Sequence, residues 1–399
     1  MKYIIVLGDG MADEPLSGLH GQTPLEYAST PYMDNIAGKA AIGLAKTIPD
    51  GMKPGSDTAN LAVLGYDPKR YYTGRSPLEA LSIGVDMEEN DIAIRCNLVT
   101  VSDDGLPYEE KTIIDHSSGE ISTEDASVLL DAVRKELEDG NYQFYDGTSY
   151  RHCTIWKNGS VVELTPPHDI LGREIGEYLP AENELREKMK KSYEILNNHP
   201  INVERAKKGL NKANSIWFWG AGTKPALDSF EGKFGKKGAM ISAVDLLKGI
   251  AVGAGMCNID VKGADGTLET NYEGKAEAAV KAVTGDGNDF VYVHVEAPDE
   301  MGHQGSVERK IKAIEYLDGR IIGPIYERMK ELGEDFRMLV MPDHPTPIST
   351  RTHSSDPVPY MLYDSTKEEE HTWKYNEKEA KESGNYIGEG YTLIRELFR

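Results

Sequence analysis

The chain has 399 residues, more than one small hydrophobic core usually holds, so we expect two domains. Hydrophobic residues make up 39% and charged residues 28%, which is typical of a soluble globular protein. The net charge of −22, from 44 basic and 66 acidic residues, argues against a nucleic-acid partner but leaves room for an anionic substrate in a local basic pocket.

The cysteines and the N-terminus indicate the compartment. Cys96, Cys153 and Cys257 form no CxxC pair, so a disulfide framework or a thiolate zinc site is not expected. The apolar run at residues 3–7 is too short for a signal peptide or a membrane span. We therefore expect a cytoplasmic protein with reduced thiols and no membrane partner. No sequence feature defines an oligomeric interface.

Apolar runs bounded by Gly, Pro or Asp alternate with helical patterns along most of the chain. The runs predict strands at residues 3–7, 215–219, 239–244, 290–295, 336–341 and 359–363. Apolar positions at helical spacing predict helices at 243–252, 275–283 and 307–330. This alternation predicts an α/β fold, with a mostly parallel sheet flanked by helices.

A middle stretch, residues 85–185, has a different pattern. It predicts a strand at 91–101, a helix at 122–139 and two alternating runs at 150–157 and 160–164. Asn158-Gly159 joins these two runs and is a strong hairpin signal. We therefore predict a smaller α+β domain at 85–185, inserted into a discontinuous core formed by 1–84 and 186–399. The charged stretch 182–191 predicts an exposed helix that leads back to the core.

Asp and His residues follow three of the predicted strands. Ligands in open parallel sheets bind beyond the carboxyl ends of the strands, so these side chains should meet at one edge. In chain order they are Asp9, then Asp299 and His303, then Asp343 and His344, with His353 in the following loop.

These residue types suit Mn²⁺, Zn²⁺ or Mg²⁺. Asp299 and His303 are four residues apart, so one helical turn would place both on one face. Prolines around Asp343 restrict the backbone and would preorganise its side chain. A single Asp-x-x-x-His pair or a lone His is more often structural. The convergence of several such residues at strand ends favours a metal site.

The stretch PGSDTAN, residues 54–60, precedes a predicted helix at 58–64. Ser56 or Asp57 could simply cap that helix. Alternatively, Ser56 could be a nucleophile, because helix N-terminal N–H groups attract anions and a divalent cation can stabilise the alkoxide. The residues alone leave both interpretations open.

Taken together, GDGMAD, PGSDTAN, APDEMGH, MPDH and THSSDPVPY resemble the alkaline phosphatase superfamily. The chain is most similar to the archaeal-type cofactor-independent phosphoglycerate mutases, from Met1 to Arg399. The resemblance implies an alkaline-phosphatase-like core that holds two divalent metal ions, Mn²⁺ or Zn²⁺ with Mg²⁺ possible. It also implies that Ser56 accepts the phosphoryl group. The implied ligands of one ion are Asp299, His303 and His353, and those of the other are Asp9, Ser56, Asp343 and His344.

The same resemblance implies that the inserted domain is a lid that binds the rest of the substrate. The implied reaction interconverts 3-phosphoglycerate and 2-phosphoglycerate, a step of glycolysis, through a phosphoserine. Free glycerate would stay bound and reorient between the two transfers, so a closing motion is expected. The implied substrate-binding residues are Arg75, Asp91, Arg95, Arg151, His168, Asp169 and Lys224.

One departure keeps other functions open. The chain reads Gly74-Arg75-Ser76 where the mutases are expected to have Gly-Arg-Gly, and the stretch RCNLVT also differs. A bacterial branch of the family is proposed to act as an ATP-dependent homoserine kinase in threonine biosynthesis, with the same metals and Ser56. The chain has no GxxxxGK[ST] loop, so a kinase would handle ATP at the metal site. A phosphomonoesterase and a non-catalytic metal-binding protein are the remaining alternatives.

Overall fold

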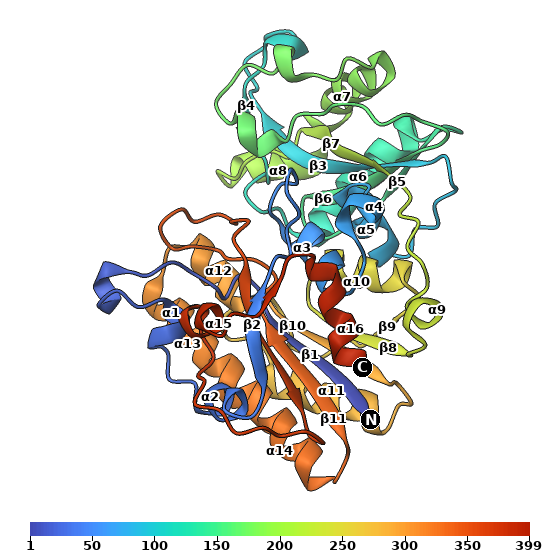
Figure 1. The fold of residues 1–399 in the computed structure, drawn as a ribbon. Helices are drawn as coiled ribbons and strands as arrows, with labels where there is room; N and C mark the ends of the chain where they lie inside the picture. Colours follow the sequence, from blue (N-terminus) through green and yellow to red (C-terminus); the bar gives the residue numbers. More distant parts are fainter. The chain divides into compact units, whose positions relative to one another are not determined.

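A computed structural model describes residues 1–399, which form two compact units (Figure 1). The core unit contains residues 1–72 and 226–399, and the inserted unit contains residues 73–225. The inserted unit is therefore longer than the 85–185 expected from the sequence, by residues on both sides. None of the helices combines the length and the apolar character needed to cross a membrane.

The core unit is built on an eight-stranded, mostly parallel sheet. Five neighbouring strands, β11-β1-β10-β8-β9, are parallel, whereas β12 runs antiparallel to both β11 and β2. This confirms the predicted α/β class. In sheet order the strands are β13 (Tyr386–Ile387), β2 (Ala41–Ala45), β12 (Val358–Asp364), β11 (Phe336–Met341), β1 (Lys2–Gly8), β10 (Phe290–Val295), β8 (Gly238–Ile241) and β9 (Cys257–Asn258).

Helices cover both faces of this sheet. In chain order they are α1 (Pro24–Tyr27), α2 (Pro31–Ala37), α3 (Ser56–Val63), α4 (Pro68–Tyr71), α9 (Phe230–Phe234), α10 (Asp245–Gly253), α11 (Tyr272–Thr284), α12 (Ala297–His303), α13 (Val307–Leu317), α14 (Gly323–Glu331), α15 (Glu377–Glu382) and α16 (Leu393–Phe398), with short helical turns η1 (Ser17–Leu19) and η6 (Gly390–Thr392).

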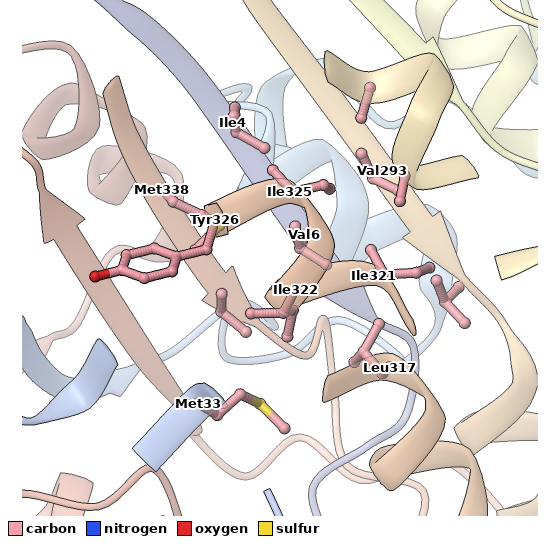
Figure 2. Close-up of a cluster of buried hydrophobic side chains, with 14 of the residues drawn as sticks. Ile4, Val6, Met33, Val293, Leu317, Ile321, Ile322, Ile325, Tyr326 and Met338 are labelled. Atoms are coloured by element: carbon pink, nitrogen blue, oxygen red, sulfur yellow. The ribbon is translucent and has the colours of Figure 1, made fainter. Parts of the chain in front are cut away.

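One face of the sheet packs on the continuous helical segment 307–331. Figure 2 shows Leu317, Ile321 and Ile325 lying over side chains of β1, β10 and β11, such as Val6 and Val293, and all of these side chains are buried. The sequence predicted a single helix at 307–330. The structure confirms helix over this range, and it adds a π-helical turn, η5 (Asp318–Ile322), between α13 and α14.

The inserted unit contains a five-stranded antiparallel sheet in which β3 pairs with β4, β6 and β7. Its strands are β3 (Ile92–Val101), β4 (Ile113–Asp115), β5 (Tyr142–Tyr145), β6 (Arg151–Trp156) and β7 (Ser215–Thr223). Its helices are α5 (Arg75–Ser82), α6 (Thr123–Leu137), α7 (Asn183–Leu196) and α8 (Pro200–Lys207), with turns η2 (Tyr108–Glu110), η3 (Pro167–Ile170) and η4 (Gly176–Tyr178).

The run at 215–219 is a strand, but its predicted place in the core sheet was wrong. It forms β7, which pairs with β3 in the inserted unit, with Phe218 opposite Cys96. Helix α7 buries Leu185 and Met189 in the same hydrophobic cluster as Phe218. A short apolar run does not reveal which sheet it joins, and this pairing extends the inserted unit to residue 225.

The predicted hairpin around Asn158-Gly159 was also wrong. Asn158 does adopt a left-handed turn conformation, with φ of 49°, but residues 160–164 form no strand. The strand β5 takes the neighbouring position on β6 instead, because Tyr142 and Phe144 bury their rings in the core of the unit. Val161 remains 59% exposed.

Candidate active site

Three carboxylates of the core unit lie where adjacent parallel strands end. Asp9 directly follows β1, Asp299 lies in α12 just after β10, and Asp343 follows β11, and all three are buried. The backbone N–H of Asp9 donates to the carbonyl of Val295 at 2.9 Å, which ties the ends of β1 and β10 together. The sheet therefore brings together side chains from distant parts of the sequence, as the strand-end pattern predicted.

Gly10 allows this close approach. Its φ is 59°, in the left-handed region, and its N–H donates to Asp343 Oδ1 at 3.1 Å. A Cβ atom at this position would lie 2.6 Å from Asp299 Oδ1. Only glycine fits between the two carboxylates in this conformation.

The first candidate metal cluster contains Asp9, Asp343 and His344, whose ligand atoms lie within 4.8 Å of one another. His344 Nε2 is 3.5 Å from Asp9 Oδ1 and 3.4 Å from Asp343 Oδ2. The Nδ1 atom of His344 lies 3.3 Å from the carbonyl of Pro345, a partner that needs a donor. A proton on Nδ1 leaves the lone pair of Nε2 facing the two carboxylates, as ligation requires.

The second candidate cluster contains Asp299, His353 and again His344. His353 Nε2 is 3.5 Å from Asp299 Oδ1. His303 adjoins this cluster, because its Nε2 lies 3.2 Å from Asp299 Oδ2 and 3.0 Å from His353 Nε2. The structure thus brings together every residue of the predicted ligand set, with His344 belonging to both clusters.

Electrostatics of the clusters fit divalent cations. Burial and the negative charges of Asp343 and Asp299 raise the pKa of Asp9. Asp9 Oδ1 is fully buried and has no hydrogen-bond partner, an expensive arrangement unless a cation accepts its charge. Oxygen and nitrogen donors in this number suit Mn²⁺, Zn²⁺ or Mg²⁺ rather than a soft metal.

The second cluster has its own charge balance. Burial disfavours the Asp299 carboxylate, but hydrogen bonds from His303 and His353 outweigh it, so the pKa of Asp299 is well below its usual range. The hydrogen bond with Asp299 in turn raises the pKa of His303 to about 9. These imidazoles stabilise the carboxylate, as a cation in the same place would.

Ser56 opens helix α3 beside the first cluster. The N-cap of α3 is Gly55, and no side chain caps the helix, so the interpretation of Ser56 or Asp57 as the cap was wrong. Ser56 Oγ instead lies 3.1 Å from His344 Nε2. The hydroxyl is therefore free of a structural role in the helix and faces the clustered ligands.

Two buried polar residues near the clusters were not predicted from the sequence. His294, on β10, lies with Nε2 2.9 Å from Asp9 Oδ2 and Nδ1 3.2 Å from Ser242 Oγ. Lys310, on α13, donates to Asp13 Oδ2 and to the carbonyl of Thr346, both at 2.8 Å. The available signal was a polar residue at a buried position: His294 within an apolar strand, and Lys310 on the inner face of an amphipathic helix.

In the inserted unit, two predicted substrate-binding arginines meet at one carboxylate. Arg95 Nε lies 2.8 Å from Glu79 Oε2, and Arg75 Nε lies 2.9 Å from Glu79 Oε1. The Arg95 guanidinium also lies over the Trp219 ring, 4.1 Å from its centroid. Arg95 is thus held on two sides by its own unit.

Imidazole and aromatic rings extend this group of side chains. The ring of His168 meets that of Trp219 edge-on, with centroids 5.2 Å apart, and is 6.1 Å from the ring of His116. His116 contacts Tyr150, and the Arg151 guanidinium lies 5.3 Å from the Tyr150 ring. Two cationic side chains, Arg95 and Arg151, and two imidazoles, His116 and His168, therefore lie along one aromatic path.

The other predicted substrate-binding residues have local partners. Asp91 is buried. Its carboxylate accepts hydrogen bonds from Lys157 Nζ, at 2.7 Å, and from the N–H of Glu88. Lys224 Nζ donates to the carbonyl of Met87. Asp169 is exposed and lies 3.7 Å from the neighbouring His168 ring. The contacts of Asp91 and Lys224 stabilise loops and do not involve the aromatic path. Asp169 adjoins that path through His168.

Comparisons with known proteins agree with this arrangement. The family described as 2,3-bisphosphoglycerate-independent phosphoglycerate mutase matches residues 37–202. A protein of that name from Methanosarcina barkeri is 50% identical over 390 residues, covering 96% of each chain. A solved structure from Pyrococcus horikoshii covers 99% of this chain and 96% of its own, with a TM-score of 0.81 and 30% identity. The solved cofactor-independent phosphoglycerate mutase of Thermoplasma acidophilum covers 100% and 99%, with a TM-score of 0.67 and 28% identity.

Proposed function

The chain belongs to the family of 2,3-bisphosphoglycerate-independent phosphoglycerate mutases, and on this premise we propose that it interconverts 3-phosphoglycerate and 2-phosphoglycerate through a phosphoserine at Ser56. It is then an isomerase that needs no bisphosphorylated cofactor. The single observation that carries the assignment of Ser56 is its 3.1 Å approach to His344 Nε2, at a helix start where it caps nothing.

The clustered ligands would hold two divalent cations, with Mn²⁺ or Zn²⁺ favoured and Mg²⁺ possible. Such cations offset the charge of the phosphoryl group and lower the pKa of a nearby hydroxyl. We assign Asp299, His303 and His353 to one ion. The other ion is assigned to Asp9, Asp343 and His344, together with Ser56.

Ser56 Oγ forms a bond to phosphorus, and the bond between phosphorus and the substrate oxygen breaks. The proton of the serine hydroxyl ends on that oxygen, which leaves glycerate with two free hydroxyls. After glycerate turns in the site, its other hydroxyl attacks the phosphoserine and restores the Ser56 hydroxyl. The N–H groups at the start of α3 favour the negative charge at Ser56 during both transfers.

Glycerate must be retained between the transfers, and we assign this task to the inserted unit. Arg151 and His168 suit a carboxylate, because guanidinium and imidazole groups donate charge-assisted hydrogen bonds. Glu79 positions Arg75 and Arg95 within the same unit. Asp169 adjoins His168 and is assigned to its orientation.

The test is an assay of 3-phosphoglycerate turnover by metal-stripped protein reconstituted with Mn²⁺, without bisphosphoglycerate. We expect 2-phosphoglycerate to form, and to cease forming when the metal is removed by a chelator. Absence of turnover in reconstituted protein with Ser56 intact would contradict the proposal. Release of inorganic phosphate from many esters would indicate a phosphomonoesterase instead.

The homoserine kinase alternative rests on Ser76 in the Gly74-Arg75-Ser76 stretch. Ser76 is buried, and its hydroxyl donates to the carbonyl of Gly220 within the inserted unit. This contact accounts for the serine by local structure, so Ser76 gives the kinase no support, and the named relatives favour the mutase. The same protein assayed with ATP and homoserine separates the two activities, because only a kinase consumes ATP in a homoserine-dependent way.

A further inference from the structure

Asn60 is a fully buried amide on α3, one helical turn after Ser56. Its Nδ2 donates to the carbonyl of Ser56 and to Asp343 Oδ2, both at 2.8 Å. Its Oδ1 accepts from the hydroxyl of Tyr292 at 2.5 Å. One side chain thus links the backbone of the candidate nucleophile, a candidate metal ligand and a strand of the core sheet.

The orientation of this amide is determined by its partners. Ser56 O and Asp343 Oδ2 can only accept hydrogen bonds, so both need the NH₂ side of Asn60. The Tyr292 hydroxyl supplies the donor that Oδ1 needs, and burial keeps the pKa of Tyr292 well above its ordinary value, so the hydroxyl stays protonated. Without this donor, Oδ1 would be a buried acceptor with no partner.

The contact also completes the hydrogen bonds of Asp343. Asp343 Oδ1 accepts from the N–H groups of Gly10 and His344, at 3.1 Å and 2.9 Å. Asn60 supplies the donor to Oδ2. Three neutral donors fix the carboxylate plane, and carboxylates fixed in this way bind a cation with less reorganisation.

We propose that Asn60, oriented by Tyr292, is a positioning residue. It fixes the position of the Ser56 backbone relative to the carboxylate of Asp343. Asn60 acts through these two groups and touches neither substrate nor cation. The inference rests on the proposed function for its kinetic consequence, but its consequence for metal affinity is independent of the substrate. Its sequence signals are weak, since one Asn in a helix and one Tyr in an apolar strand are ordinary.

The matched control for Tyr292 is Tyr375. Tyr375 is equally buried in the core unit, and its hydroxyl donates to the backbone carbonyl of Pro359 at 2.9 Å, with that of Val340 at 3.2 Å. Tyr292→Phe and Tyr375→Phe each remove one buried hydroxyl and keep the ring. A merely structural role predicts similar effects of the two changes on every property.

The experiment measures free Mn²⁺ by electron paramagnetic resonance during titration of metal-stripped wild type, Tyr292→Phe and Tyr375→Phe. We expect Tyr292→Phe to weaken Mn²⁺ binding at one of the two sites about tenfold. This is the loss in affinity expected when one hydrogen bond to an orienting amide is removed. Tyr375→Phe should bind Mn²⁺ like the wild type. In the mutase assay, Tyr292→Phe should lower kcat about tenfold with an unchanged KM, because the substrate contacts stay intact.

Asn60→Asp and Asn60→Ala provide the second measurement. Asn60→Asp keeps the shape but turns the donor face into an acceptor beside Asp343, so it should lower Mn²⁺ affinity more than Tyr292→Phe does. Equal Mn²⁺ affinities in the wild type, Tyr292→Phe and folded Asn60→Ala would overturn the inference. Equal losses in Tyr292→Phe and Tyr375→Phe would do the same. If wild type lacks mutase activity, the proposed function fails, and the Mn²⁺ affinities still decide the inference.

Discussion

The core unit and the inserted unit both gather charged residues, but they hold them differently. In the core unit the candidate carboxylate ligands are buried: Asp343 is 0% and Asp9 is 2% exposed, and each is fixed at a strand end. In the inserted unit the side chains of Arg75 and His168 are each 46% exposed. Under the proposed function this difference corresponds to a division of work: the rigid core site would transfer the phosphoryl group, and the more exposed side chains of the inserted unit would bind the organic part of the substrate.

The largest expected effect tests the core side of this comparison. Ser56→Ala should lower turnover on the order of 10⁴-fold or more, because it removes the proposed nucleophile, and the hydroxyl of Thr346, which also contacts the clusters, donates its proton to Asp299 Oδ1. The fold and most of the metal affinity should remain, since Ser56 caps no helix. Activity, Mn²⁺ binding and thermal unfolding are the three measurements.

Ser229→Ala is the control, because Ser229 is a true cap that accepts from the N–H of Gly232 at the start of α9. It should lose about 1 kcal/mol of unfolding free energy and keep full activity. A loss of stability in Ser56→Ala as large as that in Ser229→Ala would mean that Ser56 has a structural role after all.

The next effect concerns the carboxylates. Asp343→Asn removes a buried charge that offsets a cation, so Mn²⁺ affinity at one site should fall on the order of a hundredfold, and most activity with it. Elemental analysis of protein equilibrated at fixed Mn²⁺ should show one ion fewer per chain.

Asp318→Asn is the matched change, since Asp318 is also a buried carboxylate of the core unit but accepts from the N–H groups of Tyr32 and Met33. It should reduce stability and leave the metal content unaltered. If both variants keep the wild-type content of Mn²⁺, the contrast between a ligand and a structural carboxylate is lost.

A smaller effect is expected in the inserted unit. Arg151→Ala should raise KM for phosphoglycerate about tenfold to a hundredfold with little change in kcat, as expected for one charge-assisted hydrogen bond to the ground state and transition state alike. Arg173→Ala, an exposed arginine of the same unit that bonds to the Tyr178 hydroxyl, should leave both constants unchanged. A fall in kcat alone for Arg151→Ala would place this residue in the chemistry rather than in binding.

The smallest effect concerns stability and pH. Glu377, on α15, accepts from the N–H of Asp13 and from Thr23 Oγ1, and burial raises its pKa from 4.5 to about 7. Between pH 4.5 and 7 the folded chain therefore holds a proton that the unfolded chain has released. The unfolding free energy should fall as the pH rises through this range, by up to about 1 kcal/mol per pH unit.

Glu377→Gln should remove this slope, whereas Glu382→Gln, a change at an exposed position of the same helix, should keep it. Urea unfolding at several pH values measures both. Parallel slopes in the wild type and Glu377→Gln would show that this carboxyl group ionises normally in the folded protein.

Much of the core unit could be predicted because its strands and strand ends have patterns that short stretches of sequence reveal. Strands buried on both faces of a parallel sheet read as continuous apolar runs, so residues 3–7, 290–295 and 336–341 were recognised, and Asp9, Asp299 and Asp343 follow directly from the rule for strand ends. The candidate metal ligands were thus predicted from position and residue type together, and the structure places them close to one another.

The inserted unit was harder to predict because its pairing is decided by tertiary contacts. The run at 215–219 has the same pattern as a core strand, and only its pairing with β3 assigns it to the inserted unit. The Asn158-Gly159 turn forms without the hairpin, because β5 occupies the partner position. Asn60 was not predicted for a related reason. Its three partners, on Ser56, Asp343 and Tyr292, come together only in the folded chain.

The topology has a consequence for synthesis of the protein. Strand β1 is made long before its neighbours, because it lies between β10 and β11, whose pairing residues begin at Phe290 and Phe336. Both edges of β1 therefore stay unpaired until β10 and β11 have been translated. The inserted unit, continuous from residue 73 to 225, has all its strands by then and can fold first on the ribosome. The synthesis of the core unit thus starts before that of the inserted unit and ends after it.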